Sequence, residues 1–174
     1  MRILFLHNNY PAQFKYLISA LLDDGHEIYF LSSFKGNANP KVKQFWSKNP
    51  TEDPKAATEY FRLSLEKLSN KYKFDLIISH SGFFCGTYAK FYFPDTPLIS
   101  YLEWWFTNHP SHLITPTLYI NHLPKTYSKL YLRNKDTALE LASADAIVSP
   151  TKWQCQFLPE SLRSRVSVIF DGVP

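Results

Sequence analysis

Short apolar runs alternate with segments of helical periodicity along the chain, and this alternation constrains the fold more than any other feature. Residues 2–6 and 27–31 are two such runs, each typical of a buried strand. Between them, over residues 11–24, apolar residues recur at i, i+3, i+4, i+7 and i+8, and Gly25 stands where a helix commonly ends. A strand, a helix and a strand in this order predict a parallel crossover unit.

The same alternation continues to the end of the chain. Further strands are expected over residues 75–79, 97–101, 145–149 and 166–170. Helices are expected over residues 53–72, 84–92, 137–144 and 153–163, the last one short because Pro159 lies inside it, and residues 32–53 are expected to be a loop. About six strands separated by helices predict an α/β fold: a Rossmann-like, doubly wound, mostly parallel sheet with helices on both faces.

Composition and motifs exclude several functional classes. The chain has 174 residues and 5 glycines, with neither a G-x-G-x-x-G fingerprint nor a P-loop. Two distant cysteines match no metal spacing, and no apolar run approaches the length of a membrane span, so we expect a reduced, cytoplasmic protein. The net charge of +4 permits contact with phosphates, but no nucleic-acid-binding module is recognisable and we expect no nucleic acid partner.

Residues 104–135 are rich in aromatic and basic side chains and have two open interpretations. They either touch a membrane interface or an anionic acceptor, the former placing the protein at the inner face of the membrane, or form a core-packing insert with a solvated basic rim. His109, His112 and His122 fall in this stretch, but their spacing fits no usual metal pair and no carboxylate accompanies them. We therefore expect neither a metal nor another cofactor.

Ligands of such sheets bind at the carboxyl ends of the strands, and these ends fall in loops 7–10, 80–82, 103–105 and 149–152. In the first loop, Asn8 or Asn9 either caps the following helix or helps to hold an anion. His80 either hydrogen-bonds a sugar hydroxyl or a phosphate oxygen, or bonds a neighbouring backbone carbonyl. Lys152 either meets a phosphate or is a solvated surface charge.

Several segments carry a family resemblance. MRILFLH at residues 1–7, YPAQF at 10–14 and GHEI at 25–28 resemble the opening of family 4 glycosyltransferases, which are retaining enzymes of the GT-B fold. HSG at 80–82, YLEW at 101–104, LRN at 132–134, SAD at 143–145, SPTKWQ at 149–154 and DGV at 171–173 match one bacterial branch more closely. The resemblance covers essentially the whole chain through the order and spacing of these segments.

The resemblance implies that residues 1–170 are the N-terminal, acceptor-side Rossmann-like domain, that residues 171–174 begin the inter-domain linker, and that the C-terminal donor domain with its Glu-x7-Glu motif is absent. It implies transfer of a sugar from a nucleotide-sugar donor, bound mainly by the C-terminal domain, to a glycan or lipid-linked acceptor in bacterial polysaccharide biosynthesis, with the isolated domain inactive. The alternative is a non-catalytic module that binds a glycan or a partner protein.

The resemblance also assigns site residues. His80 matches a cleft histidine that contacts the transferred sugar, and is the one catalytic residue expected. The substrate-binding positions are Asn9, Tyr10, Ala12, Gln13, Ser81, Gly82, Glu103, Trp104, Arg133 and Lys152. The family usually has glycine where Ala12 stands, and alanine adopts a positive φ less cheaply than glycine. This departure bears on how closely a ligand can approach the backbone at residue 12.

Overall fold

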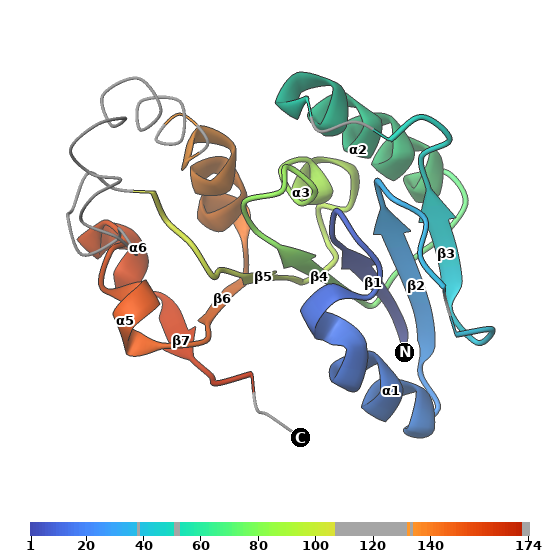
Figure 1. Ribbon diagram of the computed structural model, residues 1–174, viewed down its shortest axis with the longest axis horizontal. Coiled ribbons are helices and arrows are strands. Elements are labelled where there is room, and N and C mark those ends of the chain that lie inside the picture. The colour runs from blue at the N-terminus through green and yellow to red at the C-terminus, as the bar shows by residue number, and fades with distance from the viewer. Residues whose placement is uncertain (38, 51–52, 107–131, 133, 172–174) are drawn as a thin grey trace, which may run out of the picture.

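A computed structural model describes residues 1–37, 39–50, 53–106, 132 and 134–171. The described residues form one sheet of seven strands in the order β3-β2-β1-β4-β5-β6-β7, with every neighbouring pair parallel (Figure 1). The strands are β1 (Arg2–Leu6), β2 (Glu27–Ser32), β3 (Lys43–Trp46), β4 (Leu76–His80), β5 (Leu98–Tyr101), β6 (Ala146–Ser149) and β7 (Val166–Val168). The predicted Rossmann-like fold class is confirmed.

Helices connect most of these strands. They are the 3-10 turn η1 (Ala12–Phe14), α1 (Lys15–Asp23), α2 (Pro54–Ser69), α3 (Ala89–Tyr92), a helix over residues 134–143, α5 (Lys152–Cys155) and α6 (Glu160–Arg163). The longest, α2, begins where the sequence provides a start signal: the Asp53 carboxylate accepts the Ala56 N–H at 2.8 Å, and proline occupies the first helical position.

The structure corrects three of the predicted elements. Residues 43–46 form the edge strand β3 inside the expected loop. The sequence did not predict this strand, because it is short and half-exposed and has no continuous apolar run. The helix expected over residues 84–92 is reduced to α3, since Phe84 takes a φ of +63° that a helix cannot accommodate. The last helix divides into α5 and α6 at Pro159, which precedes the first residue of α6.

The two faces of the sheet carry separate hydrophobic cores. The larger core packs α2, α3, the 134–143 helix and α5 against one face, and Phe61, Leu65 and Leu141 are fully buried in it. The smaller core packs η1 and α1 against β1 and β2 on the opposite face. Figure 1 shows α1 on the other side of the sheet from α2 and α3. Beyond α1, a groove of about 380 Å³ follows β4–β6, with Leu17, Ile99 and Phe170 among its lining residues.

Strand order places a crevice beside β1 and β4. These strands are neighbours, yet the chain leaves β1 toward β2 and leaves β4 toward β5, on opposite sides. Connections that diverge in this way leave the carboxyl ends of the two strands uncovered, and ligands of doubly wound sheets bind there. His7 directly follows β1 and His80 ends β4. In the described part of the chain, no helix has the length and apolar character needed to cross a membrane.

Candidate active site

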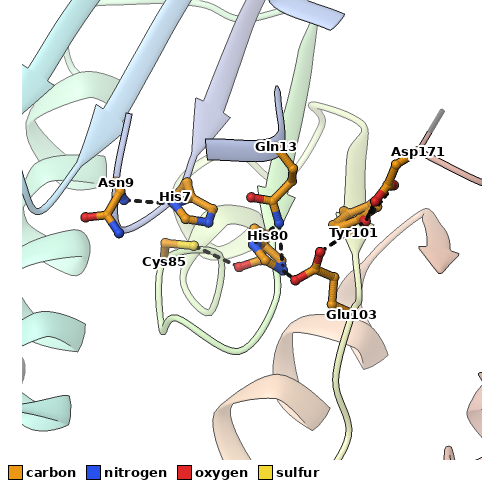
Figure 2. A network of polar contacts seen from close by, with 8 residues as sticks. All are labelled: His7, Asn9, Gln13, His80, Cys85, Tyr101, Glu103 and Asp171. Carbon is orange, nitrogen blue, oxygen red and sulfur yellow. Dashed lines mark hydrogen bonds and ion pairs between the residues drawn. The ribbon is translucent and has the colours of Figure 1, made fainter. Parts of the chain in front are cut away.

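His80 lies at the centre of a network of polar contacts at this crevice (Figure 2). Its imidazole is 2% exposed, and the Gln13 amide nitrogen approaches its Nδ1 to 2.7 Å. On the other side, Glu103 Oε2 lies 3.5 Å from His80 Nε2. The same amide nitrogen lies 3.3 Å from Nε2, so Gln13 contacts both ring nitrogens of His80. The structure thus brings together three predicted site residues from η1, β4 and the end of β5.

His7 forms the second half of this centre, although the sequence did not mark it as a site residue. The imidazole rings of His7 and His80 stack with centroids 4.8 Å apart and planes 26° apart. The Asn9 backbone N–H donates to His7 Nδ1 at 2.8 Å, which leaves the ring proton of His7 on Nε2. Phe83 covers both rings, at 4.8 Å from each.

Both imidazoles are neutral at physiological pH. Burial lowers the pKa of His7 to about 4. Burial also lowers the pKa of His80 well below its usual value, and the nearby His7 adds a smaller effect in the same direction. A second proton on His7 would also break the hydrogen bond that the Asn9 N–H donates to its Nδ1. Each ring therefore offers one donor and one acceptor without net charge.

Two carboxylates border the histidine pair. The Tyr101 hydroxyl lies 2.6 and 2.7 Å from the two oxygens of Asp171 and 3.4 Å from Glu103 Oε1. Burial, and next the negative charge of Asp171, raise the pKa of Glu103. Burial and the hydrogen bond to Asp171 raise the pKa of Tyr101, so the phenol remains a donor. This side of the site carries negative charge and therefore suits hydroxyl groups better than a diphosphate.

The loop after β1 has the predicted residues in an arrangement that the sequence did not reveal. Ala12 adopts a φ of +48°, so alanine does occupy the left-handed conformation at this position. The Tyr10 ring packs edge-on against Phe30, and its hydroxyl accepts the Asn39 N–H at 3.3 Å. Asn9 is exposed, and neither η1 nor α1 receives a side-chain cap, so capping by an asparagine of this loop was a wrong alternative.

The remaining predicted positions divide between the edge of the site and its interior. Ser81 is buried and donates its hydroxyl to Glu140, whereas Gly82 takes a φ of +97° with open space around its Cα. Trp104 packs on Trp153 with centroids 5.7 Å apart, and Lys152 is exposed at the start of α5. Arg133 lies outside the described residues, as do the three histidines between residues 109 and 122. The substrate contacts of all these residues stay predictions.

The sequence analysis placed His7 in a loop at the ligand-binding edge but gave it no role of its own, and it gave Tyr101 and Asp171 no role in the site. A signal for His7 was present, because a histidine directly after the first buried strand of a doubly wound sheet must lie at its ligand-binding edge. Tyr101 and Asp171 gave no such signal, since their contact joins β5 to the segment after β7. Within the described ranges, no group of three or more His, Cys, Asp or Glu side chains is arranged to hold a metal ion.

Sequence comparison places this fold and site in a family. The profile of the glycosyl transferase family 4 group matches residues 24–174, so the chain belongs to this family. The match includes His80 and Glu103, while His7 and Gln13 precede it. No curated protein matches the chain significantly in sequence.

Solved structures agree with the fold. MnaA of S. aureus, in a co-structure with UDP, matches 96% of this chain and 43% of its own length at 18% identity, with a TM-score of 0.61. Alr3699/HepE of Anabaena, in complex with UDP and glucose, matches 99% and 45% at 14% identity, with a TM-score of 0.55. UGT2 of Phytolacca americana, complexed with UDP-2fluoro-glucose and pterostilbene, matches 97% and 53% at 11% identity, with a TM-score of 0.55. The chain spans about half the length of each.

Proposed function

We propose that this chain is the acceptor-side domain of a retaining glycosyltransferase that moves a sugar from a nucleotide-sugar to a glycan or lipid-linked acceptor in bacterial polysaccharide biosynthesis. The observation that carries the proposal is the neutral, buried His80 at the switch point of a family 4 domain. A neutral imidazole carries one N–H, so His80 can donate to a sugar hydroxyl without adding charge to the site.

The charges around His80 support a model in which this domain binds the acceptor and a second domain binds the donor diphosphate. Glu103 and Asp171 make the acceptor side of the site negative. A departing nucleoside diphosphate needs cationic groups or backbone N–H donors, and carboxylates at short range would oppose it. We infer that a second, donor-binding domain supplies those groups, that residues 171–174 begin the linker to it, and that this chain alone has no transferase activity.

The cellular setting is part of the same proposal. Both cysteines, Cys85 and Cys155, are free and buried, which suits the cytoplasm, where nucleotide-sugars are also consumed. Contact with the inner face of the membrane rests on residues 104–135, most of which lie outside the described residues. Sedimentation with liposomes tests it: binding that requires anionic lipid at low salt is expected, and no lipid-dependent binding would end this part of the proposal.

The decisive experiment uses the two-domain protein. His80→Ala should abolish transfer from the nucleotide-sugar while leaving nucleotide affinity, measured by calorimetry, unchanged. His26→Ala is the matched control, because His26 precedes β2 and lies at the opposite end of the sheet from His80. Unchanged turnover in the His80 variant would refute the role of this residue. Glycan binding without any turnover in the wild-type protein would favour a non-catalytic, glycan-binding module instead.

A further inference from the structure

A fully buried acidic residue, Glu140, lies directly behind the candidate site. It belongs to the helix over residues 134–143, whose buried stripe otherwise consists of Asn134, Thr137, Leu141 and Ala144. The side chain is 1% exposed. A carboxyl group removed from water in this way is costly unless hydrogen bonds replace the lost solvent, so its partners indicate what it is for.

The partners of Glu140 come from three segments of the site's own framework. Ser81 Oγ donates to Glu140 Oε1 at 2.9 Å, and Ser100 Oγ donates to the same oxygen at 3.0 Å. The Ser79 hydroxyl and the Gly86 backbone N–H complete the set. The Ser81 and Ser100 hydroxyls both donate to Glu140, as suits the acceptor oxygens of a carboxylate. Burial nevertheless raises the pKa of Glu140, and the hydrogen bonds oppose this shift.

Gly86 shows that the loop after β4 is shaped around this carboxylate. A Cβ at residue 86 would collide with the Glu140 carboxyl group and with Ser79 Oγ. Glycine is therefore required here by the close approach of Glu140, at a φ that any residue can adopt. The loop after β4 therefore packs closely against the Glu140 side chain of a helix more than 50 residues later in the chain.

The anchored segment is the one that carries His80. Ser81 is held twice, by its hydroxyl on Glu140 and by its N–H on Tyr101 O at 2.8 Å. The carbonyl of His80 accepts the Cys85 thiol at 3.1 Å. The peptide between residues 80 and 81 is thereby fixed from both sides, and the imidazole is fixed in turn by Gln13 and His7.

We propose that Glu140 is a positioning residue: its carboxylate holds Ser81 and thereby sets the place and orientation of the His80 imidazole. The proposal rests on the proposed function only in taking His80 as the group that meets the sugar. Glu140 itself touches no substrate, because it lies beneath β4 and β5 and has no access to solvent.

The test follows the His80 ring directly, in the 174-residue chain labelled with ¹⁵N-histidine, by long-range ¹H–¹⁵N NMR. Glu140→Gln keeps the shape of the side chain but turns an amide N–H₂ toward groups that donate. We expect the His80 ring signals to move by more than their linewidth and to broaden, while the His26 signals stay in place. Glu140→Asp keeps the acceptor oxygens and should restore the His80 signals in part.

Two further variants keep the test decisive if Glu140→Gln fails to fold. Ser100→Ala removes one donor to Oε1 and leaves the rest of the network, so it should move the His80 signals in the same direction by less. Leu139→Ala, on the exposed side of the same helix, should leave them unchanged. His80 signals identical to wild type in the folded Glu140→Gln protein, or in Ser100→Ala if only that one folds, would overturn the proposal. Transfer plays no part in this readout, so its outcome is independent of the His80→Ala experiment.

Discussion

The neutrality of the stacked histidines has a measurable consequence for stability. The pKa of His7 is about 4 in the folded chain, against about 6.5 for an unfolded histidine. Between these two pH values the unfolded chain binds more protons at residue 7 than the folded chain does, so the free energy of unfolding falls as the pH falls. From pH 7 to pH 5, the contribution of His7 decreases by about 2 kcal/mol.

Other groups act in the same pH range, so the prediction concerns a difference. His80 adds a loss in the same direction, because its pKa is also lowered. Glu140 opposes it, since a carboxyl group with a raised pKa favours the folded state more strongly as the pH falls toward its unfolded value. His7→Gln cannot titrate, yet its amide oxygen can accept the Asn9 N–H. The variant removes the contribution of His7 together with its smaller effect on the pKa of His80, and leaves the burial effects on His80 and Glu140 in place.

The assay is urea unfolding followed by tryptophan fluorescence at pH 7 and pH 5. The free energy of unfolding of wild type minus that of His7→Gln should be smaller at pH 5 than at pH 7 by about 2 kcal/mol. Ile18→Val is the control: it removes a methyl group from the same core and should lower stability equally at both pH values. A wild-type minus His7→Gln difference that is independent of pH would refute a neutral, buried His7.

Three further changes test the local structure by the same unfolding assay. Ala12→Gly should raise the free energy of unfolding by about 1 kcal/mol, because it relieves a φ of +48°, whereas Ala20→Gly inside α1 should lower it by a similar amount. Asp53→Ala removes the cap of α2 and should lower the free energy of unfolding by about 1 kcal/mol. Asp53→Asn keeps a capping oxygen and should therefore keep most of the wild-type stability. Leu65→Ala opens a cavity in the larger core and should cost about 3 kcal/mol.

Periodicity predicted the fold well wherever burial alone decides the structure. The apolar runs over residues 2–6, 27–31 and 97–101 became β1, β2 and β5 with boundaries shifted by no more than one residue. Prediction failed where local geometry or tertiary pairing decides. The edge strand β3 pairs with β2 through its backbone although its own residues are half-exposed. Residues 84–88, which include the positive φ at Phe84, lie outside the helix that the apolar pattern favoured.

The candidate site was predictable to the extent that it depends on strand ends. His80 and Glu103 were selected in loops at the ligand-binding edge and Gln13 by the family resemblance, and the structure brings these three into contact. The role of Glu140 could not be predicted from the sequence, because it depends on a hydrogen bond to Ser81, 59 residues earlier in the chain. The sequence does carry one signal of a buried acidic residue. Glu140 falls on the buried stripe of the predicted helix, four positions before Ala144, which continues that stripe.

The residues behind the histidine pair explain how an uncharged imidazole can be placed accurately. A charged catalytic group can be steered over several ångströms, whereas a neutral imidazole must be placed by packing and by directional hydrogen bonds. Phe83 and the stacked ring of His7 restrict the plane of the His80 ring, and the Gln13 amide contacts both of its nitrogens. Glu140 lies on the interior side of β4 and β5, where its hydrogen bonds to Ser81 and Ser100 hold the backbone beside the His80 imidazole.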